Sequence, residues 1–372
     1  MAKPRVVGAL IGDIQREAFA RVKYGDLFDR LAQEVDLLAV HDATLRGARR
    51  YLNLAQAFHP NRARWKERFY KNLPAFDLRS RQVRDFLKRW EGKADFCLQL
   101  GVMFDAAVPG GAISNVIYTD YTAALSAERR DAGRSPFTAD QRRRWLALER
   151  GAFAHARHIC TRSDLVRRSV IEDYGIAPDK VTMVGGGVNF SPLPDVPDRS
   201  GRETCTILFI GKEFARKGGD LLLEAFVKLH TSRPNLRLKM VTAGPIPTGL
   251  PLDGVTVIPP TWDRSVIAGL FRQADLFVLP SRLETWGDVL LEAMAYGLPC
   301  VGVRGQSMEE IIEDGVTGRL AEPEDAASLA QAVAEYIDAP NACWEAGRQA
   351  RRVVEERFTW AAVAKKLAQV MI

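Results

Sequence analysis

The sequence contains few cysteines and no long apolar run. Its 372 residues include only five cysteines, and none of them forms a Cys-x-x-Cys pair. Neither a disulfide framework nor a structural zinc site of the usual spacing is therefore indicated. No uninterrupted apolar stretch approaches the roughly 18 residues that a membrane-spanning helix needs. The apolar run near the N-terminus is too short for the core of a signal peptide, so we expect a cytoplasmic protein.

Two motifs of nucleotide chemistry are also missing. There is no Gly-x-x-x-x-Gly-Lys-Ser/Thr loop, which excludes a nucleotide-triphosphate site of the P-loop type. No Asp-x-Asp pair occurs, and such a pair is expected where a divalent ion bridges a diphosphate. We therefore expect an activity that needs neither a metal nor another cofactor.

Positive charge is concentrated in the first half of the chain. Residues 1–190 carry a net charge of about +10, against about −4 for residues 191–372. Much of the excess lies in residues 43–92, a basic and helix-prone stretch. This asymmetry indicates an anionic partner for the first half, although solvated helix faces explain it equally well.

The second half alternates short apolar strands with helices of about ten residues. The expected strands are residues 206–210, 236–242, 255–259, 276–280 and 300–303. The expected helices are residues 220–230, 264–273, 288–296 and 308–313. Such alternation predicts a parallel sheet that is covered by helices on both faces.

The first half shows the same alternation with more interruptions. Its expected strands are residues 6–11, 35–40, 95–100, 113–119 and 181–184, with a helix over 26–33. A proline-rich segment, residues 189–203, reads as a linker. The fold class that follows is α/β, with two Rossmann-like domains that face each other across a cleft. Their expected extents are 1–190 and 204–354, and a closing helix over 355–372 would pack back on the first domain.

A basic loop follows the first expected strand of the second domain. It reads GKEFARKGGD over residues 211–220 and contains Lys212, Arg216 and Lys217. Cations and flexible glycines ahead of a helix form a plausible diphosphate clamp. The bland alternative is a solvent-exposed basic turn.

A second loop carries two carboxylates. Residues 281–299 read SRLETWGDVLLEAMAYGLP and begin where an expected strand turns into a helix. Gly287 allows close approach of the backbone to a ligand, and the free N–H groups of a helix start suit a phosphate. Glu284 lies before this turn and Glu292 lies in the helix. Taken alone, both could be solvated surface carboxylates.

Together these segments resemble glycosyltransferase family 4. The resemblance rests on the Glu-x7-Glu pattern of Glu284 and Glu292, the Glu-Ala-Met-Ala-x-Gly-x-Pro that overlaps it, and residues 217–226. It is specific over about residues 150–320 and nearly absent over 43–92. It implies the GT-B fold of two facing domains, an N-terminal one for the acceptor and a C-terminal one for the nucleotide sugar. It further implies a retaining transfer of a hexose from a UDP- or GDP-linked donor to a glycan or lipid-linked acceptor, as in polysaccharide or lipopolysaccharide biosynthesis.

The resemblance also implies roles for individual residues. Glu284 would contact hydroxyls of the donor sugar, Glu292 would contact the ribose, and Lys217 would bind the leaving diphosphate. The backbone N–H groups that would assist Lys217 are those of Thr285, Trp286 and Gly287.

Other positions depart from the family pattern. Lys212 stands where the family usually has arginine, and Arg216 is a candidate to supply the missing guanidinium. The histidine expected after the fifth strand is replaced by Thr119, which Asp120 follows, so Asp120 or Thr119 is the candidate for its positioning role.

Two other classes of function compete with this interpretation. A nucleotide-sugar epimerase or phosphorylase on a similar fold lacks a matching motif. An inactive transferase fold that binds an anionic surface or nucleic acid is supported only by the arginine-rich residues 61–90. The intact Glu284, Glu292 and Lys217 argue against inactivity, so nucleic acid is not an expected partner.

Cations and aromatic side chains interleave over residues 46–71. The cations are Arg46, Arg49, Arg50, Arg62, Arg64, Lys66, Arg68 and Lys71. The aromatic residues are Tyr51, Phe58, Trp65, Phe69 and Tyr70. A helix with both kinds of side chain suits the boundary of an anionic bilayer. We expect reversible association with the inner face of the membrane, with a cleft for an anionic soluble sugar or plain solvated helices as the alternatives.

Overall fold

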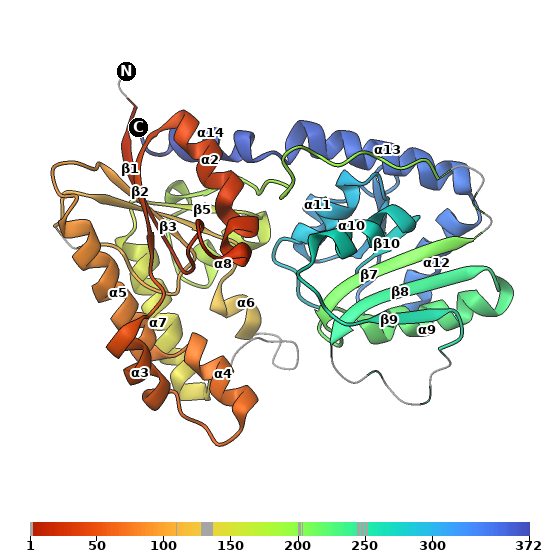
Figure 1. The fold of residues 1–372 in the computed structure, drawn as a ribbon, viewed down its shortest axis with the longest axis horizontal. Helices are drawn as coiled ribbons and strands as arrows, with labels where there is room; N and C mark the ends of the chain where they lie inside the picture. The colour runs from red at the N-terminus through yellow and green to blue at the C-terminus, as the bar shows by residue number, and fades with distance from the viewer. Residues whose placement is uncertain are drawn as a thin grey trace. The chain divides into compact units, whose positions relative to one another are not determined.

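The chain forms two compact units in the computed structural model, which describes residues 3–108, 110–127, 137–199, 202, 204–243, 246, 249 and 252–372. The first unit holds the described residues up to Gly187 together with Trp360–Ile372, and the second holds Val188–Thr359. Each unit has its own sheet, which Figure 1 shows as a ribbon. Residues 200, 201 and 203 of the expected linker lie outside the described ranges.

The first unit contains a six-stranded parallel sheet in the order β2-β1-β3-β4-β5-β6. Its strands are β1 (Arg5–Leu10), β2 (Asp36–Asp42), β3 (Phe96–Leu100), β4 (Ser114–Thr119), β5 (His158–Thr161) and β6 (Val181–Met183). Five of them were predicted to within two residues. The sequence did not predict β5, because its four residues include a histidine and give too short an apolar run.

The second unit repeats this architecture with the strand order β12-β11-β10-β7-β8-β9. Its strands are β7 (Cys205–Glu213), β8 (Leu236–Ala243), β9 (Val255–Ile258), β10 (Leu276–Val278), β11 (Cys300–Val303) and β12 (Gly318–Ala321). All of their pairings are parallel. The expected α/β class with two Rossmann-like units is confirmed.

Helices cover both faces of the first sheet. They are α1 (Ala18–Ala20), a π-helix (Arg21–Gly25), α2 (Asp26–Glu34), α3 (Gly47–Gln56), α4 (Arg62–Tyr70), α5 (Leu73–Lys88), α6 (Ala123–Ala127), α7 (Ala139–His155), α8 (Asp164–Glu172) and α14 (Trp360–Gln369). The helix-prone residues 43–92 thus form α3, α4 and α5. Apolar residues of α2 and α14 pack on one face of the sheet, and those of α5, α7 and α8 pack on the other.

The helices of the second unit include one correction to the sequence analysis. They are α9 (Gly219–Ser232), α10 (Arg264–Gln273), α11 (Asp288–Ala295), α12 (Ala326–Ile337) and α13 (Pro340–Arg357). Residues 308–313 were expected to be helical, but only a 3-10 turn forms, over Ser307–Glu310. The chain bends soon afterwards at Gly315, whose φ is 82°, to enter β12, so there is no length for a full helix.

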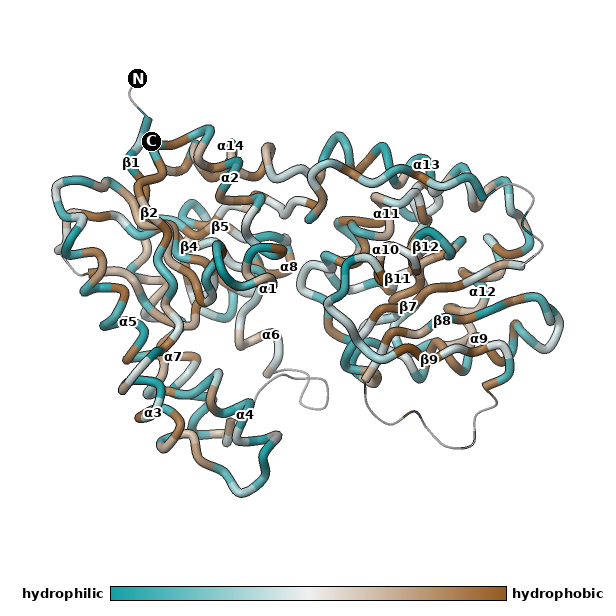
Figure 2. The backbone as a smooth tube through the Cα atoms, viewed as in Figure 1, coloured by the Kyte–Doolittle hydropathy of each residue, from teal (hydrophilic) through white to brown (hydrophobic). Residues whose placement is uncertain are grey.

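Both faces of the first sheet are buried, as neighbouring residues of β1 show. Val6 and Leu10 belong to the apolar cluster under α2 and α14, whereas Val7 and Ala9 belong to the cluster under α5. Successive side chains of a strand point to opposite faces. Strands buried on both sides are therefore continuously apolar, and Figure 2 shows them in brown at the centre of each unit.

The last helix of the chain belongs to the first unit. Figure 1 shows α14 beside α2, and Trp360 at its start is buried. Gly187 lies against Trp360 so closely that an added Cβ atom would come within 2.5 Å of the Trp360 nitrogen. This contact fixes where the chain re-enters the first unit.

Replacing two helical glycines by alanine should have opposite effects on the stability of the protein. A Cβ atom at Gly347 of α13 would lie 2.2 Å from the carbonyl oxygen of Gly297, whereas one at Gly269 of α10 would meet nothing within 4 Å. We expect Gly347→Ala to lower the free energy of unfolding by about 1–3 kcal/mol through overpacking. The matched change Gly269→Ala should raise it by about 0.4–1 kcal/mol. Urea unfolding of both variants checks this, and similar effects in the two would contradict the packing of α13 on Gly297.

Candidate functional site

The loop between β7 and α9 holds Lys217 close to the next strand of the sheet. Gly218 has a φ of 72°, and a Cβ atom there would lie 1.9 Å from the carbonyl oxygen of Pro280. Only glycine therefore allows this approach of the two backbones. No side chain caps the start of α9. Lys217 consequently lies at an uncapped helix start, beside the loop that follows β10.

Lys217 and Glu284 form an ion pair between these two loops. Both side chains are largely buried, with 13% and 12% of their surfaces exposed. The structure thus brings together two residues that the sequence analysis named separately. The ammonium group of such a pair attracts an anion, and its carboxylate accepts hydrogen bonds from hydroxyl groups.

The loop that carries Glu284 is fixed by residues that follow β11. Ser307 donates from Oγ to the carbonyl oxygens of Glu284, at 2.8 Å, and of Trp286, at 3.1 Å. Gln306 accepts a hydrogen bond from the Glu284 N–H. The sequence analysis missed both residues, since no local signal marks a side chain that supports a distant loop.

The helix α11 begins without a side-chain cap. Gly287 is the N-cap residue, and its φ is 103°. The indole of Trp286 is buried and packs edge-on against Phe358, with ring centroids 6.0 Å apart. The Trp286 side chain is therefore used in packing, and the Thr285 side chain is half-buried. That the backbone N–H groups of Thr285, Trp286 and Gly287 assist Lys217 stays a prediction. Free N–H groups at such a helix start favour a phosphate.

Arg216 and Arg282 brace the two loops. Arg216 is buried, pairs with Glu213 and donates to the carbonyl oxygen of Leu283 at 2.9 Å. Arg282 donates to both carboxylate oxygens of Asp220 at 2.7 and 2.8 Å. Arg216 thus has a structural place in the site, and its contact with a donor stays a prediction.

Lys212 lies at the end of β7 with an exposed side chain. Its role as a donor-binding residue also stays a prediction.

Glu292 is held in α11 by a residue that the sequence analysis did not name. Arg264, the first residue of α10, donates to Glu292 at 3.0 Å. The guanidinium of Arg264 also lies 4.9 Å from the ring centre of Phe190. Burial raises the pKa of Glu292, and the positive charge of Arg264 offsets this only in part.

Asp120 lies in the first unit, just after the carboxyl end of β4. Its carboxylate accepts a hydrogen bond from Lys23 at 3.1 Å. Burial alone would raise the pKa of Asp120, but the charges of Lys23 and Arg162 outweigh it and hold that pKa well below its ordinary value. Asp120 is therefore an ionised acceptor of hydrogen bonds at neutral pH. Thr119 is buried, and its hydroxyl donates to the carbonyl oxygen of Tyr121.

The described part of the chain contains neither a membrane-spanning helix nor a cluster of metal-binding side chains. No helix within the described ranges combines the length and the low polarity needed to cross a bilayer. Among those same residues, no group of three or more His, Cys, Asp or Glu side chains is placed to hold a metal ion.

The pair of Arg264 and Glu292 predicts a pH-dependent stability. Because the pKa of Glu292 is raised on folding, this group stabilises the folded state less as pH rises above its ordinary value of 4.5. Arg264→Met removes the partner, so we expect a loss of about 1–3 kcal/mol in the free energy of unfolding at about pH 8. At about pH 4, where Glu292 is protonated, the loss should be much smaller.

Thermal unfolding at both pH values measures this difference. In the Glu292→Gln background, the effect of Arg264→Met should not depend on pH. A pH-dependent effect that persists there would show that Arg264 acts on another group.

Part of the second unit matches a known family. Residues 204–339 match the family described as Glycosyl transferases group 1, a range that contains every candidate site residue of this unit. A D-inositol 3-phosphate glycosyltransferase 2 of Catenulispora acidiphila is 31% identical over 241 residues, which cover 58% of this chain and 56% of that protein. The glycogen synthase of Mycobacterium tuberculosis is 28% identical over 236 residues, or 61% of this chain and 55% of that enzyme. The chain thus spans slightly more than half the length of these curated relatives.

Solved structures resemble the whole chain in fold. A sucrose-phosphate synthase from Thermosynechococcus elongatus has a TM-score of 0.67 at 18% identity and covers 99% of this chain and 98% of that one. Anabaena Alr3699/HepE, solved in complex with UDP and glucose, has a TM-score of 0.65 at 17% identity, with 98% of both chains covered. The glycosyltransferase WaaG has a TM-score of 0.64 at 18% identity and covers 98% of this chain and 99% of that one. The chain has the fold of these three proteins, and residues 204–339, which include the candidate site of the second unit, match Glycosyl transferases group 1.

Proposed function

We propose that this protein is a retaining glycosyltransferase that transfers a hexose from a UDP- or GDP-linked donor to a glycan or lipid-linked acceptor. The observation that carries the proposal is the Lys217–Glu284 pair. It lies between two helix starts that lack side-chain caps, inside the range that matches Glycosyl transferases group 1. The complexes of Anabaena Alr3699/HepE with UDP and with UDP-glucose favour a uridine donor.

The chemistry requires that negative charge be stabilised on the leaving diphosphate. Lys217 supplies a fixed positive charge, and the first turns of α9 and α11 supply N–H dipoles. Such groups act without reorganisation, because the fold has placed them before the donor binds. We therefore propose that turnover needs no divalent ion, so that a chelator leaves the rate unchanged.

Glu284 and Glu292 are proposed to contact different parts of the donor. In the proposed complex the diphosphate attracts Lys217, and the oxygens of Glu284 accept hydrogen bonds from hydroxyl groups of the sugar. Glu292, held by Arg264, accepts hydrogen bonds from the ribose. In the first unit, ionised Asp120 positions the reacting sugar or the acceptor from the carboxyl end of β4.

A donor hydrolysis screen tests the proposal. The purified protein is incubated with common UDP- and GDP-linked hexoses, with and without a chelator, and proton NMR records the configuration of the released or transferred sugar. We expect one donor class to be hydrolysed with retention. An inverted product would contradict the mechanism. Stabilisation by a DNA duplex and by no nucleotide would favour the alternative of an inactive fold that binds nucleic acid.

Lys217 should be essential for this activity. We expect Lys217→Ala to lower kcat/KM by about 10²–10³, because it removes one preorganised charge from the leaving group. Lys228 is a matched control, since it is exposed on α9 and pairs with Glu224 one turn away. Steady-state kinetics of Lys217→Ala and Lys228→Ala measure the difference. If kcat/KM of Lys217→Ala stays within threefold of the wild-type value, the assignment of Lys217 to the diphosphate is wrong.

The helices α3 and α4 favour a peripheral membrane association as part of this function. Tyr51, Phe58 and Tyr70 are 73%, 61% and 55% exposed, although they are large and apolar. Exposed cations lie near them in the sequence, among them Arg50 and Arg62. We propose that this surface holds the protein on the inner face of the membrane, where a lipid-linked acceptor would be found.

Vesicle co-sedimentation tests the association. We expect binding to vesicles with anionic lipid, where each nearby cation contributes about 1 kcal/mol, and weaker binding at about 0.5 M salt. The change of Arg62, Arg64, Lys66 and Arg68 to Glu should abolish pelleting. If the unchanged protein does not pellet with anionic vesicles at low salt, the membrane proposal is wrong, whereas the transferase proposal stands.

A further inference from the structure

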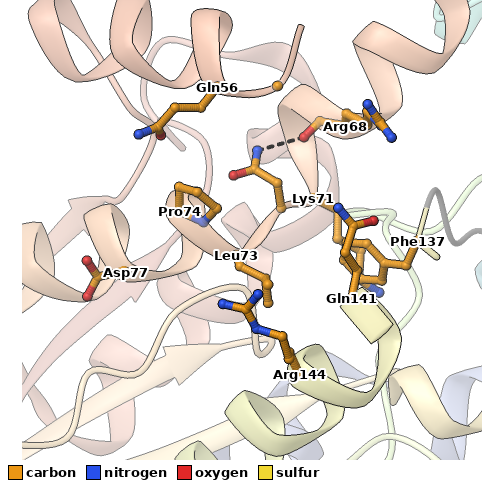
Figure 3. A pocket seen from close by; sticks show the side chains of 11 residues that line it. Gln56, Arg68, Lys71, Leu73, Pro74, Asp77, Phe137, Gln141 and Arg144 are labelled. Atoms are coloured by element: carbon orange, nitrogen blue, oxygen red, sulfur yellow. Dashed lines mark hydrogen bonds between the residues drawn. The ribbon is translucent and has the colours of Figure 1, made fainter. Parts of the chain in front are cut away.

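A pocket lies in the first unit, among residues whose sequence resembles the family least. It has a volume of about 560 Å³ and is formed by the ends of α3, α4, α5 and α7 (Figure 3). Small-molecule sites in proteins typically measure about 300–1,000 Å³. The pocket is therefore large enough for a sugar, and none of the residues assigned to the donor lines it.

The topology places this pocket beyond the carboxyl edge of the first sheet. Helix α5 leads into β3 and α7 leads into β5, so both helices begin at the edge where these parallel strands end. Leu73 and Gln141, from the first turns of the two helices, line the pocket. The N-terminus of a helix carries partial positive charge and favours anions. Both termini are already capped, that of α5 by the side chain of Asn72 and that of α7 by a capping box of Thr138 and Gln141, so they add only the positive potential of their dipoles to the pocket.

Side-chain charge adds to this preference. Arg68, Lys71 and Arg144 line the pocket, and Asp77 is its single carboxylate. Asp77 pairs with Arg81, one turn farther along α5, at 2.8 Å. Figure 3 shows the side chain of Arg144 extending from α7 toward Leu73, while Arg68 lies at the rim. The lining therefore presents a positive excess that its own carboxylate does not neutralise.

Lys71 is held against three aromatic rings at one side of the pocket. Its ammonium nitrogen lies 5.0 Å from the ring centre of Trp145, 5.1 Å from that of Tyr121 and 5.6 Å from that of Phe137. Its charge also acts on buried Glu149. These contacts tie the segment between α4 and α5 to the sheet, because Tyr121 directly follows Asp120. They leave Arg144 as the cation best placed to meet a ligand.

The remaining lining suits a carbohydrate. Gln56 offers an amide group for hydroxyls, Gln141 offers the NH2 group of an amide whose oxygen accepts from the Thr138 N–H, and Phe137 offers an aromatic ring. The amide of Asn72 is used within the fold, because it is hydrogen-bonded to Asn53, Arg68 and Ala75. Guanidinium groups bind phosphate and carboxylate groups in a bidentate manner. We infer that this pocket binds a sugar that carries a phosphate or a carboxylate group. If the proposed glycosyl transfer holds, on which this reading of the ligand as acceptor rests, the acceptor is an anionic sugar.

Direct binding tests the inference without any need for catalysis. Glucose 6-phosphate, glucuronate and uncharged glucose are titrated into the full chain by calorimetry, and vesicles that contain a phosphorylated lipid form a further arm. Arg144→Gln is compared with Arg143→Gln. Arg143 is the matched control, because it is the neighbouring residue, it pairs with Asp140 and it does not line the pocket.

We expect saturable binding of at least one anionic probe, with glucose bound at least about tenfold more weakly. Arg144→Gln should weaken the anionic probe by about 10–100-fold, and Arg143→Gln should leave it unchanged. Binding only to the vesicles would assign the anion to a lipid headgroup if Arg144→Gln weakens it and Arg143→Gln does not, because the surface of α3 and α4 is itself expected to bind anionic vesicles. Binding of glucose 6-phosphate or glucuronate would assign the anion to a soluble sugar.

The inference is overturned if no anionic probe saturates, or if the two arginine variants behave alike. Donor hydrolysis by the unchanged protein is measured separately. A protein that hydrolyses a nucleotide sugar but binds none of the anionic probes would retain the proposed function and lose this pocket. If the protein binds an anionic probe through Arg144 but hydrolyses no donor, the pocket stands as an anion site and the proposed function fails.

Discussion

The ion pair between Lys217 and Glu284 depends on the close approach of two backbones, and the rest of the candidate site depends on that pair. β7 and β10 are neighbours in the sheet, so the loops that follow them lie side by side. Gly218 lets these loops touch, because any side chain there would collide with the Pro280 carbonyl group. A charge that is largely buried needs a partner, and each of the two residues supplies the other's. A ligand with an anionic part and hydroxyl groups can take over both halves of this interaction.

Other buried charges in both units also have a partner of opposite sign. Asp120 is paired with Lys23, and Glu292 is paired with Arg264, so each carboxylate has a fixed position and stays available to accept further hydrogen bonds. Arg216 is used to join loops, which explains why a conspicuous cation of the sequence is buried. The pocket beside Arg144 differs, because its lining cations exceed the one carboxylate present. That excess of positive charge is the observation from which we infer an anionic ligand for the pocket.

Much of the fold could be predicted because it follows from local patterns. Continuous apolar runs predicted strands buried on both faces, and spacing of about 3.6 residues predicted helices such as α9 and α10. The predictions failed where the pattern was too short to read. β5 has only four residues, and the 3-10 turn at Ser307–Glu310 is set by the bend into β12 rather than by its own sequence.

The sequence by itself determined the alternation of strands and helices, the glycines at the two loops, and the presence of Lys217, Glu284 and Asp120 after strand ends and of Glu292 in a helix. Only the tertiary structure decided their partners. Glu284 is 67 residues from Lys217, and Arg264 is 28 residues from Glu292. Propensity and periodicity act over a few residues, whereas a partner is chosen by the order of strands in the sheet and by the helices that cover it. The pocket beside Arg144 is the extreme case, because residues from four helices meet there without any motif in common.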